Sequence, residues 1–533
     1  MNSGSRLAAY AACGLFAGLG LLFFGYRGAQ YDEVFFYNAL HGRGVVEYAM
    51  KFGPVTVPIM LVTYAGTLKA ALYAPLLHWF GASDATLRLP AIAFGALSVG
   101  LFFLVMRRLA GPRAAALVAF VLATDAVYLL TCVFDWGPVA LQHLLSGGAL
   151  YCLVRFAQER ADRWLFAGTL LAGLALWNKA LFAWHLMGFG LALLIIFRRG
   201  ALLRTRRQWA AALLGFVLGA APLLYYNKIH RLRTFRSNVR VGSVEVDAKL
   251  SAMNHTLDGS ALFGYLVREE PAGPVQDLKR WEQIPLALSD ALGAPRRSVQ
   301  QWLLWAAILL SPVVCWFGPL RRLALFFWLG GVLTYAQMFL TKGAGGSAHH
   351  TILMWPAPQI LLGLLLAETA RRWPQRGLLA GIAVVAVCVA GNVAVLNTYL
   401  ARFIACGPGP VWTEAIRPLV RELARRPERT VFAVDWGITQ QLEFYGQGGL
   451  GLRRNSDGVV DNLPQPAAVA TLEQGLADSA NLFVMHAEGY ETFAGVRRRL
   501  ISFAAHRGYR DVLLRTIPDR HGVVIFELHE FRK

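Results

Sequence analysis

The sequence contains few charged residues for its length. Of its 533 residues only 16% are Asp, Glu, Lys or Arg, whereas 56% are hydrophobic, and the mean hydropathy is +0.45. A soluble protein of this length needs a larger polar surface, so this composition excludes an ordinary soluble enzyme. Most of the chain is therefore expected to lie in a lipid bilayer.

Acidic residues are the scarcer kind of charge. Asp and Glu number 32 against 52 Lys and Arg, which gives a formal net charge of +20 at pH 7. In a soluble protein this balance would suggest a nucleic-acid partner, but no basic helix interleaved with stacking aromatic residues is present. The Lys and Arg residues cluster instead in short segments between apolar runs, as the orientation signals of membrane proteins do. We therefore expect no nucleic-acid partner.

Cysteine is also scarce. The six cysteines, at positions 13, 132, 152, 315, 388 and 406, show no metal-type spacing, and five of them lie within or at the edges of apolar runs. No disulfide framework is implied. Arg6 followed by an apolar stretch resembles a signal peptide, but no convincing cleavage site follows it. We therefore expect an uncleaved first transmembrane helix.

Apolar runs that are long enough, or nearly so, to cross ~30 Å of hydrocarbon are the dominant feature that is present. Eleven such spans are predicted, at 6–26, 86–106, 114–132, 137–154, 163–178, 181–197, 209–226, 299–318, 323–340, 351–369 and 377–397. The segment 54–81 is also apolar, but Pro54, Pro58, Gly66 and Pro75 interrupt it. It favours short helices at the membrane interface over a clean span.

The distribution of Lys and Arg orients these spans. With the N-terminus in the cytoplasm, the short cytoplasmic connections carry sixteen Lys and Arg, and the short connections on the other side carry only Lys179 and Lys342. This asymmetry fits the positive-inside rule. Residues 1–397 are thus predicted to form a transmembrane domain with two long outward loops, 27–85 and 227–298. The C-terminal part, 398–533, then also faces outward.

The outward C-terminal part reads as a small soluble α/β domain. Strand-like runs "TVFAVDW", "NLFVMHA", "VLLRTI" and "GVVIFEL" alternate with helix-like "TEAIRPLVRELARR" and "AGVRRRLISFAAHRG". This pattern predicts a single mixed sheet with flanking helices. The fold class is therefore a polytopic α-helical membrane protein with a C-terminal soluble α/β domain.

Polar residues of the kinds that carry chemistry gather on the outward side of the predicted spans. They are Asp32 and Glu33 in the first loop, Lys69 in an interfacial stretch, Asp135 in a short connection, Asn178 and Lys179 at the end of a span, and His349 and His350 before another span. Ionisable residues at membrane edges are expensive unless they are used or well solvated. Their convergence on one face indicates a functional site.

Each of these residues also has an ordinary structural interpretation. The two carboxylates at 32 and 33 could favour a helix N-terminus, and Asp135 could cap a turn. The two lysines could extend their ammonium groups to the interface. The adjacent histidines could be hydrogen-bonded loop residues, since no third metal ligand is evident in the sequence.

Three stretches carry a resemblance to a known family. The Asp-Glu pair is followed by "GTLKAALYAPLLHWFGASDATLRLPAIAFGALSVGLFFLVMRRLAG" (66–111), and "DWGPVALQHLL" (135–145) and "HHTILMWPAPQILLG" (349–363) add support. Residues 1–200 thereby resemble a bacterial member of the GT-C, or protein-mannosyltransferase-like, superfamily of glycosyltransferases. This group includes the transferase that adds aminoarabinose to lipid A. Relatives often carry a His-Pro-Pro or Lys-Pro sequence where this chain reads "YAGTLKAA", and an arginine where it has the two histidines.

The resemblance implies a GT-C fold of about 11 transmembrane helices in the bacterial inner membrane, with the active site and the C-terminal domain in the periplasm. It implies a sugar donor linked to polyprenyl phosphate, drawn from the membrane lipid. The acceptor would be a hydroxyl or phosphate of a glycolipid, a polysaccharide or a protein. Which sugar and which acceptor are used is left open.

Residue chemistry assigns tasks within such a reaction. A carboxylate is the natural base for an acceptor hydroxyl, which favours Asp32, with Glu33 orienting it or facing solvent. A phosphate leaving group needs no general acid, so one displacement with inversion is expected. Lys69, Lys179 and Asn178 would hold the donor phosphate. Asp135 with His349 or His350 would hold a divalent metal ion, the one cofactor suggested, or would position the acceptor.

Two other classes of function compete with this hypothesis. A transporter or flippase for lipid-linked sugars would also have many spans, but transporters typically show matched halves with broken helices. No such internal symmetry is evident in the sequence. A non-catalytic envelope scaffold would not require Asp32, Lys69 and Asp135 on one side.

Overall fold

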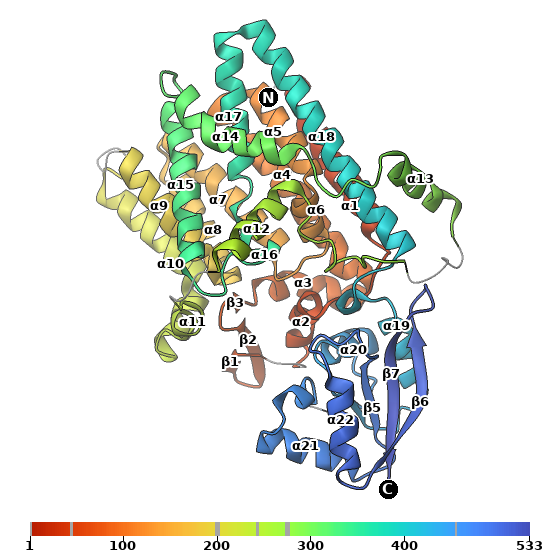
Figure 1. Cartoon of the computed structure of the whole chain (residues 1–533). Coiled ribbons are helices and arrows are strands. Elements are labelled where there is room, and N and C mark those ends of the chain that lie inside the picture. Colours follow the sequence, from red (N-terminus) through yellow and green to blue (C-terminus); the bar gives the residue numbers. More distant parts are fainter. Residues whose placement is uncertain (1–2, 43–45, 198–202, 241–244, 272–277, 454–455) are drawn as a thin grey trace.

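The computed structural model describes residues 3–42, 46–197, 203–240, 245–271, 278–453 and 456–533. It consists of a large helical body and a smaller domain built on a sheet (Figure 1). The smaller domain, formed by the C-terminal residues, lies at one end of the body next to α2 (Tyr31–Leu40) and α3 (Leu68–Phe80).

All eleven predicted spans coincide with helical segments of the body. These are α1 (Ser3–Phe23), α4 (Asp84–Ala110), α5 (Pro112–Thr124) with α6 (Ala126–Val133), α7 (Val139–Glu159), α8 (Asp162–Asn178), η1 (Ala180–Phe182) with α9 (Ala183–Ile196), α10 (Arg206–Ile229), α14 (Gln300–Val314), α15 (Arg321–Leu340), α16 (Ala348–Thr351) with η4 (Ile352–Met354) and α17 (Ala357–Arg372), and α18 (Pro374–Ala405). Among the described residues, seven helices are long and apolar enough to cross a membrane, or eight if the bent α5–α6 pair is one span. The last helix continues to Ala405, past the predicted boundary at 397.

The prediction for 54–81 is wrong in its first half. Instead of short helices, this part contains a three-stranded antiparallel sheet of β1 (Tyr48–Phe52), β2 (Val55–Val62) and β3 (Ala65–Gly66), and only α3 is helical. The reason lies in the residues themselves. The run Val55–Thr56–Val57 is β-branched, which favours strand over helix, and it follows a turn at Gly53, where φ is positive.

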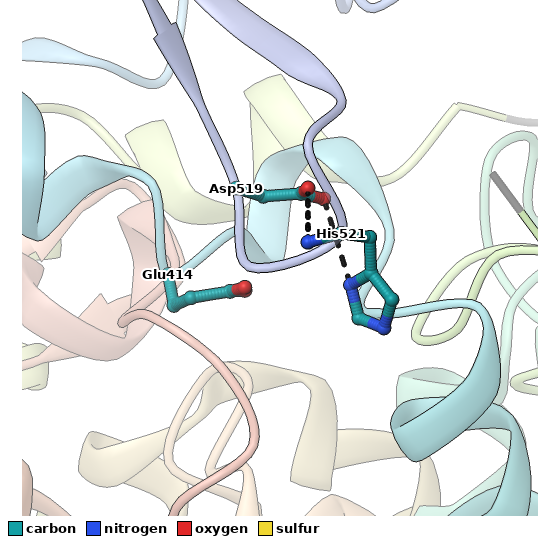
Figure 2. A group of neighbouring side chains, drawn as sticks. All are labelled: Glu414, Asp519 and His521. Carbon is teal, nitrogen blue, oxygen red and sulfur yellow. Dashed lines mark hydrogen bonds and ion pairs between the residues drawn. The ribbon is translucent and has the colours of Figure 1, made fainter. Parts of the chain in front are cut away.

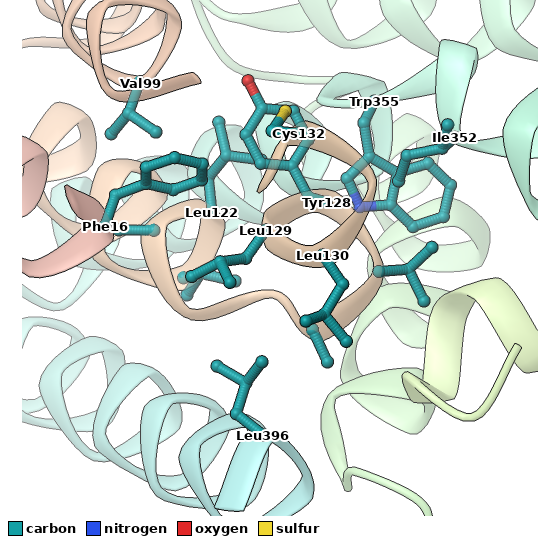
Figure 3. Close-up of a cluster of buried hydrophobic side chains, with 14 of the residues drawn as sticks. Phe16, Val99, Leu122, Tyr128, Leu129, Leu130, Cys132, Ile352, Trp355 and Leu396 are labelled. Atoms are coloured by element: carbon teal, nitrogen blue, oxygen red, sulfur yellow. The ribbon is translucent and has the colours of Figure 1, made fainter. Parts of the chain in front are cut away.

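The core of the body surrounds α6, every residue of which is buried. Figure 3 shows Tyr128, Leu129 and Leu130 of this helix among side chains from other helices, including Phe16 and Leu396. The α5–α6 pair is bent by 61° at its break. At the break the buried carboxylate of Asp125 caps α6 and accepts hydrogen bonds from three further side chains, those of Gln300, Trp355 and Gln359.

Helices α8 and α10 pack closely along small residues. Gly215 and Gly219 form a GxxxG pattern on α10, in which Gly219 faces Gly173 of α8 and Gly215 faces the Phe166 carbonyl of the same helix. A Cβ added at Gly219 would lie 2.2 Å from the Leu170 carbonyl oxygen. Small residues at this spacing let two membrane helices approach backbone to backbone.

The long second loop contributes short elements beside the body. They are α11 (Arg233–Asn238), α12 (Val246–Asp258), η3 (Arg280–Glu282) and α13 (Gln283–Ala291). In α12, Lys249 is buried and its ammonium donates to three carbonyl oxygens at the end of α15. The loop is thus fastened to the helical body.

The C-terminal domain contains the predicted mixed sheet. Its strands β4 (Val431–Ala433), β5 (Leu482–His486), β6 (Arg510–Pro518) and β7 (Val524–Arg532) have the order β4-β5-β7-β6, with β4 and β5 parallel and the other pairs antiparallel. The flanking elements are η5 (Pro410–Trp412), α19 (Ile416–Leu423), α20 (Thr439–Gly446), η6 (Val459–Asn462), α21 (Pro466–Leu476) and α22 (Val496–Ala505). The sequence predicted α19 and α22 but not α20 and α21.

Alternate strand residues face the two layers of helices. Val431 and Val484 pack with α19 and α20, whereas Phe432 and Phe483 pack with α21 and α22. Successive side chains of a strand point to opposite faces, so a sheet covered on both sides needs apolar residues throughout. This explains why β4 and the first four residues of β5 are apolar throughout.

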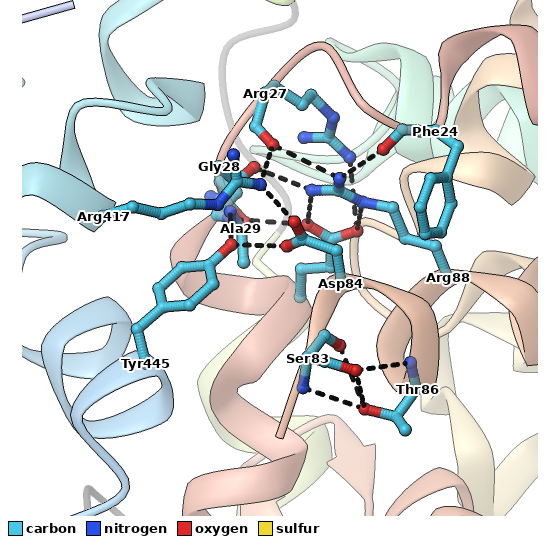
Figure 4. Close-up of polar contacts among 12 residues, drawn as sticks. Phe24, Arg27, Gly28, Ala29, Ser83, Asp84, Thr86, Arg88, Arg417 and Tyr445 are labelled. Atoms are coloured by element: carbon cyan, nitrogen blue, oxygen red, sulfur yellow. Dashed lines mark hydrogen bonds and ion pairs between the residues drawn. The ribbon is translucent and has the colours of Figure 1, made fainter. Parts of the chain in front are cut away.

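The domain joins the body through polar contacts of α19 and α20. Figure 4 shows Arg417 of α19 and Tyr445 of α20 converging on Asp84 at the start of α4. The Tyr445 hydroxyl also accepts a hydrogen bond from the Ala29 backbone N–H at 2.9 Å. The segment that leads into α2 is therefore held between the body and the domain.

Candidate functional site

The first turn of α2 presents the two adjacent carboxylates. Gln30 caps the helix, its side-chain oxygen accepting the Asp32 N–H at 2.7 Å while Glu33 completes a capping box. Successive helical residues point about 100° apart, because the helix has about 3.6 residues per turn. The two carboxylates therefore face different surroundings.

Glu33 is buried between two arginines. Its carboxylate accepts hydrogen bonds from Arg27 at 3.2 Å and Arg88 at 3.1 Å, and all three side chains are at most 1% exposed. Arg88 also donates to carbonyl oxygens of residues 24–28 (Figure 4). Burial acts to raise the pKa of Glu33, but the charges of Arg27 and Arg88 outweigh it and lower the pKa. The solvent-facing alternative for Glu33 is excluded.

Asp32, by contrast, is partly exposed and has no arginine partner among the described residues. Burial raises the pKa of Asp32, against the opposing effects of the Lys179 charge and the Trp136 side chain. Its neighbour Tyr31 stacks on Trp436 of the C-terminal domain, with ring centroids 4.9 Å apart. Asp32 thus lies where the body and the domain meet.

Lys69 and Asp135 form a buried ion pair. The Lys69 ammonium lies 2.6 Å from one Asp135 oxygen, and both side chains are 1% exposed. The other Asp135 oxygen accepts the Ala140 N–H in the first turn of α7 at 2.9 Å. Lys69 also lies over the rings of Phe36 and Tyr73. The pair connects α3 to the start of α7.

Lys179 is buried but makes no ion pair with a described carboxylate. Its ammonium donates to the carbonyl oxygens of Gly137 at 3.1 Å and His349 at 3.4 Å. Burial lowers the pKa of Lys179 to about 8, with Asp32 and Asp135 opposing that shift. Its location in the connection between α8 and α9 keeps the charge at the edge of the helical body.

The amide nitrogen of Asn178 is engaged by two neighbouring residues of the protein. Its amide nitrogen donates to the Gln142 side chain at 3.0 Å and to the Pro138 carbonyl at 3.3 Å. The residue is fully buried. It ties the end of α8 to the start of α7, and so holds Lys179 in place.

His349 and His350 lie close together, with ring centroids 4.1 Å apart. The Nδ1 atoms of both are within hydrogen-bond distance of the Ser347 hydroxyl. The His349 ring packs against Trp136 at a tilt of 40°, with ring centroids 4.5 Å apart, and Trp136 stacks in turn on Tyr265. Within the described residues, no group of three His, Cys, Asp or Glu ligand atoms includes either histidine.

The structure thus brings the predicted site residues into one region at the same end of the body. There Asp32 interacts with Lys179 and Trp136, and His349 packs against Trp136. Lys179 also donates to the His349 carbonyl. Sequence reasoning missed the residues that build its frame. Arg27 and Arg88 were not singled out, although an arginine at the edge of an apolar run beside an acidic pair is a usable signal. The aromatic residues Trp136 and Trp436 offered no such signal.

Comparisons with known proteins find a partial match to a family model and a similar fold among solved structures. Residues 68–226 match the family model described as dolichyl-phosphate-mannose-protein mannosyltransferase. No curated protein matches the sequence. Among solved structures, ArnT from Cupriavidus metallidurans bound to undecaprenyl phosphate is similar with a TM-score of 0.61 and 14% identity, covering 99% of this chain and 98% of that one.

Two further structures share this architecture. The apo state of the same ArnT gives a TM-score of 0.57 at 14% identity, over 98% of this chain and 97% of that one. The oligosaccharyltransferase of Archaeoglobus fulgidus in its apo form gives 0.51 at 11% identity, over 91% of this chain and 70% of that one. At these identities the likeness shows a common fold.

Proposed function

We propose that this chain, a member of the GT-C superfamily of glycosyltransferases, transfers a sugar from a polyprenyl-phosphate donor to an acceptor hydroxyl or phosphate. The protein would lie in the bacterial inner membrane. The transfer would take place at the outward end of the helical body, on the periplasmic side of that membrane. The observation that carries the proposal is a partly exposed carboxylate, Asp32, within electrostatic reach of a buried cation, Lys179, that has no ion-pair partner among the described residues.

Asp32 is the proposed general base. An efficient base has a pKa raised toward the working pH, because it must be ionised and still hold the proton well. Glu33 cannot share this task, since both of its neighbours are arginines that keep it ionised and engaged. Its proposed role is to fix the first turn of α2, so that Asp32 is presented to the acceptor.

Lys179 is the proposed partner of the donor phosphate. Its ammonium contacts two carbonyl oxygens and no described carboxylate, so a phosphate diester would supply the missing counter-charge. A preorganised cation stabilises the negative charge that grows on the leaving phosphate. Lys69 is less suited to direct contact, because Asp135 already neutralises it. We assign Lys69, Asp135 and Asn178 to positioning.

The predicted metal site does not fit the side chains present. Among the described residues, no group of three His, Cys, Asp or Glu ligand atoms includes Asp135, His349 or His350, and Asp135 is already paired with Lys69. The mechanism is therefore derived without a metal at His349 and His350. His349 instead supports Trp136, which lines the approach to Asp32.

The C-terminal domain is proposed to select the acceptor. Tyr31 and Trp436 form a stacked aromatic pair directly beside Asp32, one from α2 and the other from the loop after β4. Aromatic rings offer a large apolar face at low conformational cost, which suits the apolar face of a sugar ring. An acceptor glycan bound there would lie next to the base.

The test is a transfer assay with the full chain in detergent or nanodiscs and polyprenyl-phosphate sugars. Asp32→Asn is expected to lower the transfer rate by about 10²-fold or more, the usual value of a general base. Asp290→Asn is the matched control, because Asp290 is exposed on α13 away from the site. Full transfer by Asp32→Asn would refute the assignment of the base. Native protein that neither binds nor uses any such donor would refute the function.

A further inference from the structure

A second polar cluster lies away from the site described above, where the C-terminal domain meets the end of α18. Asp519 and His521 lie on the turn between β6 and β7, and Glu414 lies just before α19. Figure 2 shows Glu414 extending toward the other two side chains. One ligand atom from each residue lies within 4.8 Å of the others, and Asp519 and His521 are buried.

The histidine is held in the form that binds metals. His521 Nε2 lies 2.9 Å from the Ile404 carbonyl oxygen. A carbonyl only accepts, so Nε2 carries the hydrogen and Nδ1 carries the lone pair. Histidines that ligate metals typically donate their other ring N–H in this way.

The lone pair of His521 lies near the Asp519 carboxylate, which is also paired with Arg268. Nδ1 is buried with no hydrogen-bond partner among the described residues. It lies 4.0 Å from the nearer Asp519 oxygen, too far for a hydrogen bond even if the ring were protonated. A buried acceptor without a partner is unfavourable, and a bound metal ion would satisfy it.

Hydrogen bonds from neighbouring groups orient the carboxylates of Asp519 and Glu414, as they do for carboxylates that bind metals. Asp519 accepts the backbone N–H groups of His521 and Val523 on one oxygen and the guanidinium of Arg268 on the other. Glu414 accepts the Arg520 N–H on one oxygen at 3.1 Å. Its second oxygen is buried and has no partner among the described residues.

The negative charge of the cluster is not fully balanced by neighbouring arginines. Arg268 balances Asp519, but the Arg520 side chain pairs with Glu282 and not with Glu414. Gly407 lies against the cluster, and a Cβ there would come within 2.9 Å of His521 Nδ1. The backbone therefore approaches closely where the ligand atoms converge.

We propose that Glu414, Asp519 and His521 form a binding site for a divalent transition metal, with Zn²⁺ the favoured ion. One imidazole nitrogen and two carboxylate oxygens suit Zn²⁺, whereas Ca²⁺ and Mg²⁺ prefer oxygen ligands alone. Tetrahedral Zn²⁺ separates its ligand atoms by about 3.4 Å, so these atoms, which lie within 4.8 Å of one another, would close by up to about 1.4 Å on binding. Water would supply the fourth ligand.

The consequence of this site is structural. Glu414 precedes α19, and the other two ligands lie on the β6–β7 turn that contacts Ile404 at the end of α18. A bound ion would fasten the C-terminal sheet to the last helix of the body. It is separate from His349 and His350, and it does not depend on the proposed transfer reaction.

The experiment measures metal content in the full-length protein. After treatment with EDTA, loading with Zn²⁺ and removal of the excess, native protein is expected to retain one Zn²⁺ per chain that Glu414→Gln and His521→Ala lose. Loaded native protein should melt at a higher temperature than the EDTA-treated protein, and the variants should show no such rise. A His349→Ala/His350→Ala variant and His506→Ala, which changes an exposed histidine of the same domain, should retain the ion.

Co²⁺ supplies a second readout, because its visible absorption reports tetrahedral coordination. Native protein should show the band, and Glu414→Gln should not. If His521→Ala does not fold, Glu414→Gln alone decides, since Glu414 is only partly buried. Equal Zn²⁺ content in native protein and Glu414→Gln, or no Zn²⁺ retained by native protein, would overturn the proposal.

Discussion

The ammonium of Lys69 lies 2.6 Å from the carboxylate of Asp135, and both side chains are 1% exposed. The two residues come from α3 and from the connection before α7, which are separated along the chain by the whole of α4, α5 and α6. From the sequence alone they were expected to perform separate tasks at the donor phosphate and at the reaction centre. Their pairing makes each the counter-ion of the other.

A double-mutant cycle tests this pair. Lys69→Met and Asp135→Asn are each expected to lower the free energy of unfolding by about 3–5 kcal/mol, because each leaves a buried charge without its partner. The double variant should lose less than the two singles together. Thermal unfolding in detergent measures the three values. Losses that simply add would show that the two side chains do not interact.

Substitutions at Glu33 and Asp32 should have different effects. The first should lower stability, and the second should lower transfer activity. Glu33→Gln leaves Arg27 and Arg88 buried with no carboxylate, so we expect it to destabilise the protein by about 3–5 kcal/mol. Asp32→Asn removes no ion pair with a described arginine and should melt close to the native protein while losing transfer. Melting curves and transfer rates on the same preparations provide the comparison. Similar melting temperatures for the two variants would refute the structural role of Glu33.

The transfer rate should depend on pH with two limbs. Protonation of Asp32 should lower kcat/KM as the pH is lowered. Because the pKa of Asp32 is raised, this fall should begin at a pH above the ordinary carboxyl range. The pKa of Lys179 is lowered to about 8, so kcat/KM should fall again as the pH rises through that value and the cation is lost. Lys179→Arg keeps the charge and should move the alkaline limb to higher pH. An unchanged alkaline limb in this variant would exclude Lys179 from the donor site.

Trp436 should affect the acceptor and not the donor. Trp436→Ala removes the ring that stacks on Tyr31, and we expect the KM for acceptor to rise about tenfold, from the loss of about 1.4 kcal/mol of contact. The KM for donor and the melting temperature should change little. Trp436→Phe, which retains a stacking ring, should recover most of the loss. An equal effect on both substrates would point to a disturbed domain interface.

The close packing of α8 and α10 can be tested with a matched pair of glycines. A Cβ at Gly219 would lie 2.2 Å from a carbonyl oxygen of α8, whereas a Cβ at Gly190 of α9 meets nothing within 4 Å. Gly219→Ala is expected to destabilise the protein by about 1–3 kcal/mol through overpacking. Gly190→Ala should be neutral or stabilising, because alanine is the better helix former. Equal melting temperatures for the two variants would contradict the packing.

Much of the architecture is a local property and could be read from the chain. A bilayer of ~30 Å requires long apolar segments whose backbone groups bond within the segment, so the helical segments of the eleven apolar spans were recognisable by length and composition. The strands of the C-terminal domain were recognisable for a related reason, as short apolar runs between turns. The β1–β2–β3 sheet was not predicted, because its apolar composition is similar to that of an interfacial helix. Only the β-branched run after Gly53 distinguished it.

The partners of the site residues could be decided only by the tertiary structure. The sequence placed Asp32, Glu33, Lys69, Asp135 and Lys179 on one side of the membrane because the charge of the connecting loops orients each span. It could not show that Glu33 binds Arg88, that Lys69 binds Asp135, or that Lys179 has only carbonyl partners among the described residues. Each of these contacts joins segments far apart in the chain, and burial makes the choice of partner set the charge and pKa of each group. The proposed division of the acidic pair into a base and a positioning residue rests on those contacts.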